Sequence, residues 1–163
     1  MPFSISARRL SSRARETWLL ARALLASYEL HDWSFAFNRR KSQMGLCIYD
    51  DRVIALSVHF VELNDDDAIR DTLLHEIAHA LTGPGHGHDE VWKRKCLEVG
   101  ATPERLCFDV QMPQGRWQAT CGCCGMLHHR HREPKHKVGW HCRHCGRERG
   151  KLIWELTPPR ANL

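Results

Sequence analysis

Apolar residues recur at helical spacing in three segments of the chain. The first helix is expected to begin after Ser11 or Ser12, and its inward face would comprise Ala14, Trp18, Ala21, Leu25 and Tyr28. The second follows the acidic start at residues 64–67 and would bury Ile69, Leu73, Ile77 and Ala80. The third starts at Asp89 and continues through Val91, Trp92, Leu97 and Val99. Gly83 and Gly100 predict where the second and third helices end.

Alternating patterns predict short strands around these helices. Apolar residues at positions 33, 35 and 37 alternate with smaller or polar ones, which indicates a strand. Segments 46–49 and 53–56 flank Asp50 and Asp51 and predict a hairpin. A turn is expected to begin at Thr102 and Pro103, and residues 112–115 form a predicted linker. Further strands are predicted at 117–120, 137–141 and 151–156.

These elements predict an α+β fold in two parts. Residues 1–112 would form a small domain of helices with a short antiparallel sheet, and residues 116–157 a separate C-terminal module. The sequence contains no apolar run of membrane-spanning length and no signal peptide, so we expect a cytoplasmic protein that is neither secreted nor bound to membranes. Arg8, Arg9, Arg13 and Arg15 superficially resemble a transit peptide, but the apolar residues around Trp18 favour a folded helix.

The second predicted helix carries the sequence His75-Glu76-Ile77-Ala78-His79. Residues four apart share a helix face, so His75 and His79 can present their imidazoles to one zinc ion. Glu76 lies one step round the helix, where a carboxylate can take a proton from a metal-activated water. In a chain with 12 histidines the pattern could arise by chance at roughly 5%. The well-delimited helix favours a catalytic site over two ordinary histidines.

A catalytic zinc site needs a third protein ligand, and two histidines compete for that position. The metzincin pattern is excluded because Thr82 and Gly85 stand where it requires Gly and His. His86 lies between two glycines, whereas His88 directly precedes Asp89, the predicted helix cap. The backbone at His88 is therefore expected to be more rigid, so we favour His88 and keep His86 as the alternative.

Residues 70–81, followed by Gly87-His88-Asp89-Glu90-Val91-Trp92, resemble the SprT-like metalloprotease family, which includes the Spartan proteases. The resemblance implies a zincin-like domain that hydrolyses peptide bonds. It also implies roles for five residues: zinc ligation by His75, His79 and His88, acid/base catalysis by Glu76, and packing by Trp92. Val91 departs from the Glu that the family often has there. Tyr49 and the histidine left unligated are candidates for a second oxyanion donor.

The eight cysteines indicate a second metal site. Two matching Cys-x-x-Cys-Gly turns can each hold one metal with two thiolates, and together they predict a structural zinc ribbon with ligands Cys121, Cys124, Cys142 and Cys145. A disulfide framework is the alternative, which the missing signal peptide disfavours. Cys123 could replace a neighbour, and six nearby histidines leave a Cys/His exchange open. Cys47, Cys96 and Cys107 stand singly and are expected to be small buried thiols.

Positive charge is concentrated in this ribbon. Residues 116–151 contain nine Lys/Arg and two acidic residues, a net charge of +7, whereas the whole chain carries +5. Cations interleaved with tryptophans suit a nucleic-acid surface. The residues expected to contact it are Arg130, Arg132, Lys135, Lys137, Trp140, Arg147 and Arg149. The alternative is that the tryptophans fill the ribbon core and the charges are only solvated.

Together these features predict a zinc metalloprotease that associates with DNA, single-stranded or damaged, and cleaves DNA-bound or DNA-crosslinked proteins. The cofactors would be one catalytic and one structural zinc ion. The sequence shows no motif for ubiquitin or sliding clamps, and it does not separate DNA from RNA. One alternative is a regulatory nucleic-acid-binding protein with a non-proteolytic protease-like domain. Another is a hydrolase of a different bond, or a housekeeping peptidase, without a nucleic-acid role.

Overall fold

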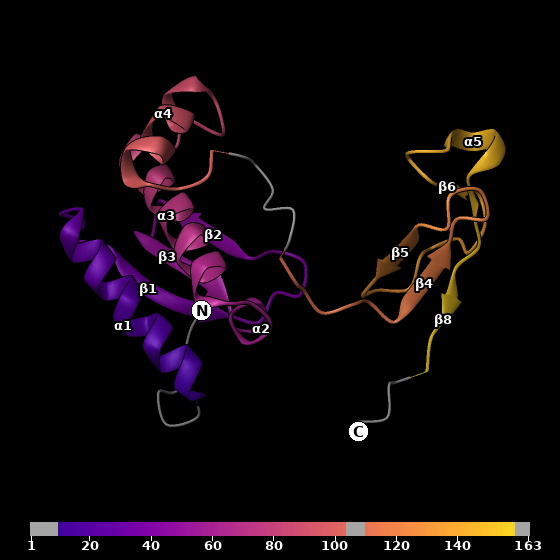
Figure 1. Ribbon diagram of the computed structural model, residues 1–163, viewed down its shortest axis with the longest axis horizontal. Coiled ribbons are helices and arrows are strands. Elements are labelled where there is room, and N and C mark those ends of the chain that lie inside the picture. Colours follow the sequence, from indigo (N-terminus) through magenta and orange to yellow (C-terminus); the bar gives the residue numbers. More distant parts are fainter. Residues whose placement is uncertain (1–9, 104–109, 159–163) are drawn as a thin grey trace. The chain divides into compact units, whose positions relative to one another are not determined.

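The computed structural model describes residues 10–103 and 110–158. The chain forms two compact units, one ending at Pro113 and the next beginning at Gln114 (Figure 1). Each unit has its own cluster of buried residues. Cys107, the first two arginines and most of the turn expected after Thr102 lie outside the described residues. No helix in the described ranges is long and apolar enough to cross a membrane.

The first unit opens with helix α1 (Ser12–Ser27), in which the Ser11 hydroxyl accepts a hydrogen bond from the backbone N–H of Ala14. The buried side chains of α1 are Ala14, Thr17, Ala21, Leu24 and Leu25. Trp18, which was expected to face the core, is 36% exposed, and the Arg22 guanidinium lies over its ring. Position 17 and position 18 both fit the helical spacing between Ala14 and Ala21. The smaller side chain, Thr17, is the one that is buried.

A three-stranded sheet lies next to α1 in order β1-β3-β2. Its strands are β1 (Ser34–Asn38), β2 (Gly45–Ile48) and β3 (Val53–Ser57). The predicted hairpin is confirmed, because β2 and β3 pair antiparallel. The predicted α+β class is confirmed, but the short sheet, predicted to be antiparallel, is mixed, since β1 pairs with β3 in parallel. β3 inserts between β1 and β2, so β1 lies beside a strand that runs in its own direction.

Three more helices complete the first unit: α2 (Val58–Leu63), α3 (Asp66–Thr82) and α4 (Glu90–Val99). The sequence did not predict α2. The predicted ends of α3 and α4 are confirmed. Asp65 and Asp89 cap their first turns, and Gly83 and Gly100 follow them with φ of 86° and 78°. Only glycine adopts such positive φ values without strain.

Asn64 ties the segment that leaves the first unit to its core. Its Nδ2 donates to the carbonyl oxygens of Phe60 and Gln111, both at 2.7 Å, and its Oδ1 accepts from the Gln111 N–H at 2.7 Å. The neighbouring Val110 and Met112 consequently pack against the core. This one buried side chain therefore fixes the last stretch of chain before the second unit.

The second unit consists of short strands and one short helix: β4 (Trp117–Thr120), β5 (Leu127–Arg130), β6 (Trp140–His141), α5 (Gly146–Arg149), β7 (Lys151–Leu152) and β8 (Glu155–Leu156). They form one sheet in order β5-β4-β8 and a second of β6 and β7. The strand predicted at 117–120 is confirmed as β4. The strand predicted at 137–141 shrinks to two residues, the one at 151–156 splits into β7 and β8, and β5 was not predicted.

Candidate active site

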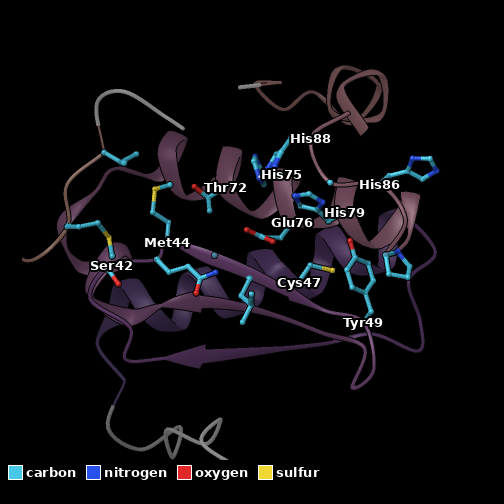
Figure 2. Close-up of a pocket in the computed structure, with 17 residues that line it drawn as sticks. Ser42, Met44, Cys47, Tyr49, Thr72, His75, Glu76, His79, His86 and His88 are labelled. Atoms are coloured by element: carbon cyan, nitrogen blue, oxygen red, sulfur yellow. Dashed lines mark hydrogen bonds between the residues drawn. The ribbon is translucent and has the colours of Figure 1, made fainter. Parts of the chain in front are cut away.

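Three imidazoles converge above the sheet of the first unit. Helix α3 presents His75 and His79, and the loop before α4 brings His88 to them (Figure 2). One ring nitrogen from each lies within 4.8 Å of the others, and Nε2 of His88 is 3.3 Å from Nε2 of His75. Two nitrogens bound tetrahedrally to zinc at about 2.0–2.1 Å would stand about 3.3 Å apart. The spacing of the donor atoms therefore fits one zinc ion.

The electrostatics of the cluster also suit a metal cation. Burial, followed by the neighbouring histidines, lowers the pKa of both His75 and His79 to about 4. Both imidazoles are consequently neutral at physiological pH, with lone pairs available, which is the form that binds metals.

Asp89 decides which of the two competing histidines joins the cluster. Its Oδ1 accepts from the Trp92 N–H at 3.0 Å, which caps α4, and its Oδ2 lies 2.8 Å from Nδ1 of His86. Figure 2 shows His86 turned away from the other histidines. His88 reaches them from a backbone with φ of 33°, a left-handed conformation that is strained for a non-glycine residue. The geometry thus selects His88 over His86.

Trp92 forms the floor behind the three imidazoles. Its side chain is fully buried, and its ring centroid lies 4.7 Å from that of His75, 5.0 Å from His79 and 4.5 Å from His88. Because Trp92 contacts all three rings, it holds their relative orientation, as the supporting residues around metal ligands do.

Glu76 lies beside the cluster on the side of β2. Only 7% of the residue is exposed, and burial raises the pKa of its carboxyl to about 8, although a hydrogen bond from the Cys47 backbone partly opposes that shift. Gly45 faces it so closely that a Cβ there would lie 2.5 Å from Oε1 of Glu76. Sequence reasoning missed Gly45, because a single glycine at a strand start also fits an ordinary turn.

The three histidines, Glu76 and Gly45 line one cleft of about 670 Å³. Residues 42–47, from the loop before β2 and from β2 itself, form one wall. In Figure 2, Ser42 and Met44 lie at one end of the cleft and Tyr49 and His86 at the other, with the histidines and Glu76 between them. Cys47 also lines the cleft, which corrects the expectation of an ordinary buried thiol. Its position two residues before Tyr49 in the strand predicted at 46–49 was the available signal, since such residues share a face.

The sequence model of the SprT-like family matches residues 14–112, which is more than half of the 163 residues. The chain belongs to the SprT-like family. No curated protein matches it. Membership indicates a zinc metalloprotease-like domain, and the matched region contains the three histidines, Glu76 and all the residues that line the cleft.

The close approach at Gly45 gives a direct test of how the SprT-like domain holds Glu76. We expect Gly45→Ala to lower the free energy of unfolding by about 1–3 kcal/mol, because the added methyl group displaces a buried carboxyl. Chemical denaturation followed by circular dichroism measures this change. Gly85→Ala is the matched control, since a Cβ there meets nothing within 4 Å. Equal stability of the two variants would contradict the proposed crowding.

Beyond the matched SprT-like region, the second unit brings four cysteines together: Cys121, Cys124, Cys142 and Cys145. Their sulfur atoms lie within 4.8 Å of one another, and the pair Cys124–Cys142 is 3.9 Å apart, close to the roughly 3.8 Å expected between sulfurs on tetrahedral zinc. Backbone N–H groups of the first turn lower the pKa of Cys121 to about 7. These cysteines are free thiols, so no disulfide forms among the described residues.

The two cysteine turns share one geometry. Gly125 donates to the Cys121 carbonyl at 2.8 Å, Gly146 donates to the Cys142 carbonyl at 2.9 Å, and both glycines have φ near 70°. Cys123 is exposed and lies outside the cluster, and no histidine of the described chain joins it. The donor set is therefore the four-cysteine type that suits structural zinc.

Cations and aromatic rings of the ribbon contact one another. The Arg130 guanidinium lies 4.6 Å from the Trp140 ring centroid and 5.9 Å from that of Trp154. Lys137 lies 5.0 Å from the Trp117 ring and 3.5 Å from a Glu133 oxygen. The other cations expected to bind nucleic acid are exposed: Arg132, Lys135, Arg147 and Arg149. Trp154 fills the small core, whereas Trp140 is 37% exposed.

Proposed function

We propose that this SprT-like chain is a zinc-dependent metalloprotease that acts on proteins bound or crosslinked to DNA. The observation that carries the proposal is the convergence of His75, His79 and His88 beside the buried Glu76 in one cleft. Three histidines leave the fourth position of a tetrahedral zinc site open, as hydrolytic sites require.

Glu76 would supply the proton transfers of this reaction. Zinc, when bound by the three histidines, supplies Lewis acidity that acidifies water and polarises a carbonyl. Glu76 takes the proton of the attacking water and later gives it to the amine nitrogen as the peptide C–N bond breaks. Burial raises the pKa of its carboxyl, which favours the protonated form that holds the proton between the two steps. The Cys47 N–H favours the ionised form from which the cycle starts.

The cleft wall supports an extended polypeptide as the substrate. β2 is an edge strand, and the continuous stretch 42–47 lines the cleft. Extended peptides bind such edges by adding a strand through main-chain hydrogen bonds, which requires no particular side chain. A protease that acts on varied DNA-bound proteins needs this kind of recognition.

The basic ribbon supports DNA as the partner. Its exposed cations can pair with phosphates, and the exposed part of Trp140 can stack on an unpaired base. The four-cysteine site requires reduced thiols, so we place the protein in the cytoplasm, at the DNA.

One experiment tests both halves of the proposal. Zinc-loaded protein is incubated with a basic DNA-binding protein, with and without single-stranded DNA, and cleavage is followed by gel electrophoresis. We expect cleavage that DNA stimulates, and a loss of about 10²- to 10⁴-fold in Glu76→Gln because the proton acceptor is gone. Metal analysis must show that the variant retains its zinc. Undiminished cleavage by that zinc-loaded variant would exclude the mechanism.

A second variant tests separately whether the ribbon binds DNA. Neutralising four exposed ribbon cations to glutamine (Lys135, Lys137, Arg147 and Arg149) is expected to remove the stimulation by DNA and to flatten the salt dependence of DNA binding. Unchanged stimulation would exclude the ribbon as the DNA-binding surface. Steeply salt-dependent DNA binding by a wild-type protein that cleaves nothing would instead establish the non-proteolytic regulatory alternative.

A further inference from the structure

We propose that Tyr49 is a second catalytic residue of the cleft, whose hydroxyl donates a hydrogen bond to the carbonyl oxygen of the peptide bond under attack. The inference rests on the proposed protease function and adds a donor that neither the zinc-binding motif nor the family match assigns. Donors aimed at the oxygen where negative charge develops are among the strongest contributions to acyl-transfer catalysis.

The position of Tyr49 is set by the strand and by its neighbours. It directly follows β2, and its carbonyl oxygen accepts from the Arg52 N–H at 3.1 Å in the turn to β3. The Trp33 ring packs edge-on against it, with centroids 6.2 Å apart. Tyr49 lines the same cleft as Glu76 and His79, and Figure 2 shows its hydroxyl pointing toward the helix that carries His79.

The hydroxyl is available to a substrate because its present partner is weak. Tyr49 hydrogen-bonds the Cys47 side chain, and a thiol sulfur is a poor acceptor. A developing oxyanion accepts far more strongly, so the bond exchanges readily when substrate arrives. Burial raises the pKa of Tyr49 to about 12, so the phenol keeps its proton at neutral pH. The proton stays on Tyr49 throughout, and no bond to the phenol oxygen is broken.

Other polar side chains of the described cleft either have hydrogen-bond partners within the protein or lie far from the end of the cleft that holds Tyr49. The Thr72 hydroxyl donates to the Ala68 carbonyl at 2.9 Å, and His86 is paired with Asp89. Ser42 lies at the opposite end of the cleft in Figure 2. The hydroxyl of Tyr49 is therefore the donor that the fold presents on the His79 side.

The chain contains only two tyrosines, which makes the test clean. Tyr28 donates to the Val99 carbonyl and does not line the cleft, so Tyr28→Phe is a matched control. We expect Tyr49→Phe to lower kcat about 100-fold with KM nearly unchanged, because the bond is made only in the transition state. Tyr28→Phe should keep the wild-type kcat. An unchanged kcat in Tyr49→Phe would overturn the proposal.

A second readout does not depend on turnover. Zinc-loaded wild-type protein is labelled with ¹³C at the tyrosine ring carbon that is bonded to oxygen, and its NMR spectrum is recorded. A phosphinic peptide is then titrated in, because its tetrahedral P–O⁻ group mimics the attacked carbonyl. We expect the Tyr49 resonance to shift and the Tyr28 resonance to stay; a stationary Tyr49 signal in the complex would overturn the proposal. Failure of the wild type to cleave any protein contradicts the protease function, whereas an active wild type with a fully active Tyr49→Phe contradicts this inference alone.

Discussion

A His88→Ala variant is expected to lose zinc from the cleft and all measurable peptidase activity. His88 provides one of the three imidazole nitrogens that meet there. Changes to residues that merely support metal ligands already cost about 10- to 100-fold in affinity, so removing a ligand must cost more. Metal analysis of the purified variant should find one zinc ion per chain, held by the ribbon, whereas two are expected in the wild type.

His86→Ala is the control for that experiment, because His86 is two positions from His88 and its side chain pairs with Asp89 instead of joining the cluster. It should keep both zinc ions and most of the activity. If His86→Ala lost the cleft zinc while His88→Ala retained it, the assignment of the third ligand would be reversed.

A Cys142→Ala variant is expected to lose the fold of the whole ribbon. The hydrophobic cluster of this unit is small, and its buried members among the described residues are Ala119, Cys121, Cys142, Leu152 and Trp154. Burial in so small a core does not offset the entropy that the chain loses on folding. Binding of structural zinc contributes about 10–16 kcal/mol to the folding free energy of small zinc-binding domains. Tryptophan fluorescence should shift to the red and DNA binding should disappear. The zinc content should fall from two ions to one, while the helical signal of the first unit remains.

Cys123→Ala tests the same region without touching the cluster, since Cys123 is exposed and lies outside the four-cysteine group. It should retain both zinc ions and the ribbon fold. A folded ribbon in Cys142→Ala, or an unfolded one in Cys123→Ala, would show that the four-cysteine site is wrongly assigned.

Local chemistry made the helices of the site predictable. Capping carboxylates at 65 and 89, together with glycines at 83 and 100, act on the residues next to them, so the sequence alone places the helix ends. The choice between His86 and His88 was harder, because both precede the same cap. It depends on the second oxygen of Asp89, which holds His86 aside, and on a strained backbone at His88 that no pattern of residue types reveals.

Features that depend on distant partners were not predictable. The parallel pairing of β1 with β3 joins segments separated by a loop and another strand. β5 has the polar sequence Leu-His-His-Arg and becomes a strand only because the first cysteine turn folds it back onto β4. Gly45 becomes important only when the sheet brings it against Glu76. In each case the decisive contact is made by a residue or strand that is not adjacent in sequence.

The hydrogen bonds of Asn64 have a mechanical consequence. Val110 and Met112 line the cleft and lie close in sequence to Pro113, where the first unit ends. A load applied to the chain beyond Pro113 would reach the wall of the cleft through the backbone. The pair of bonds between Asn64 and Gln111 is the point at which that load would be borne.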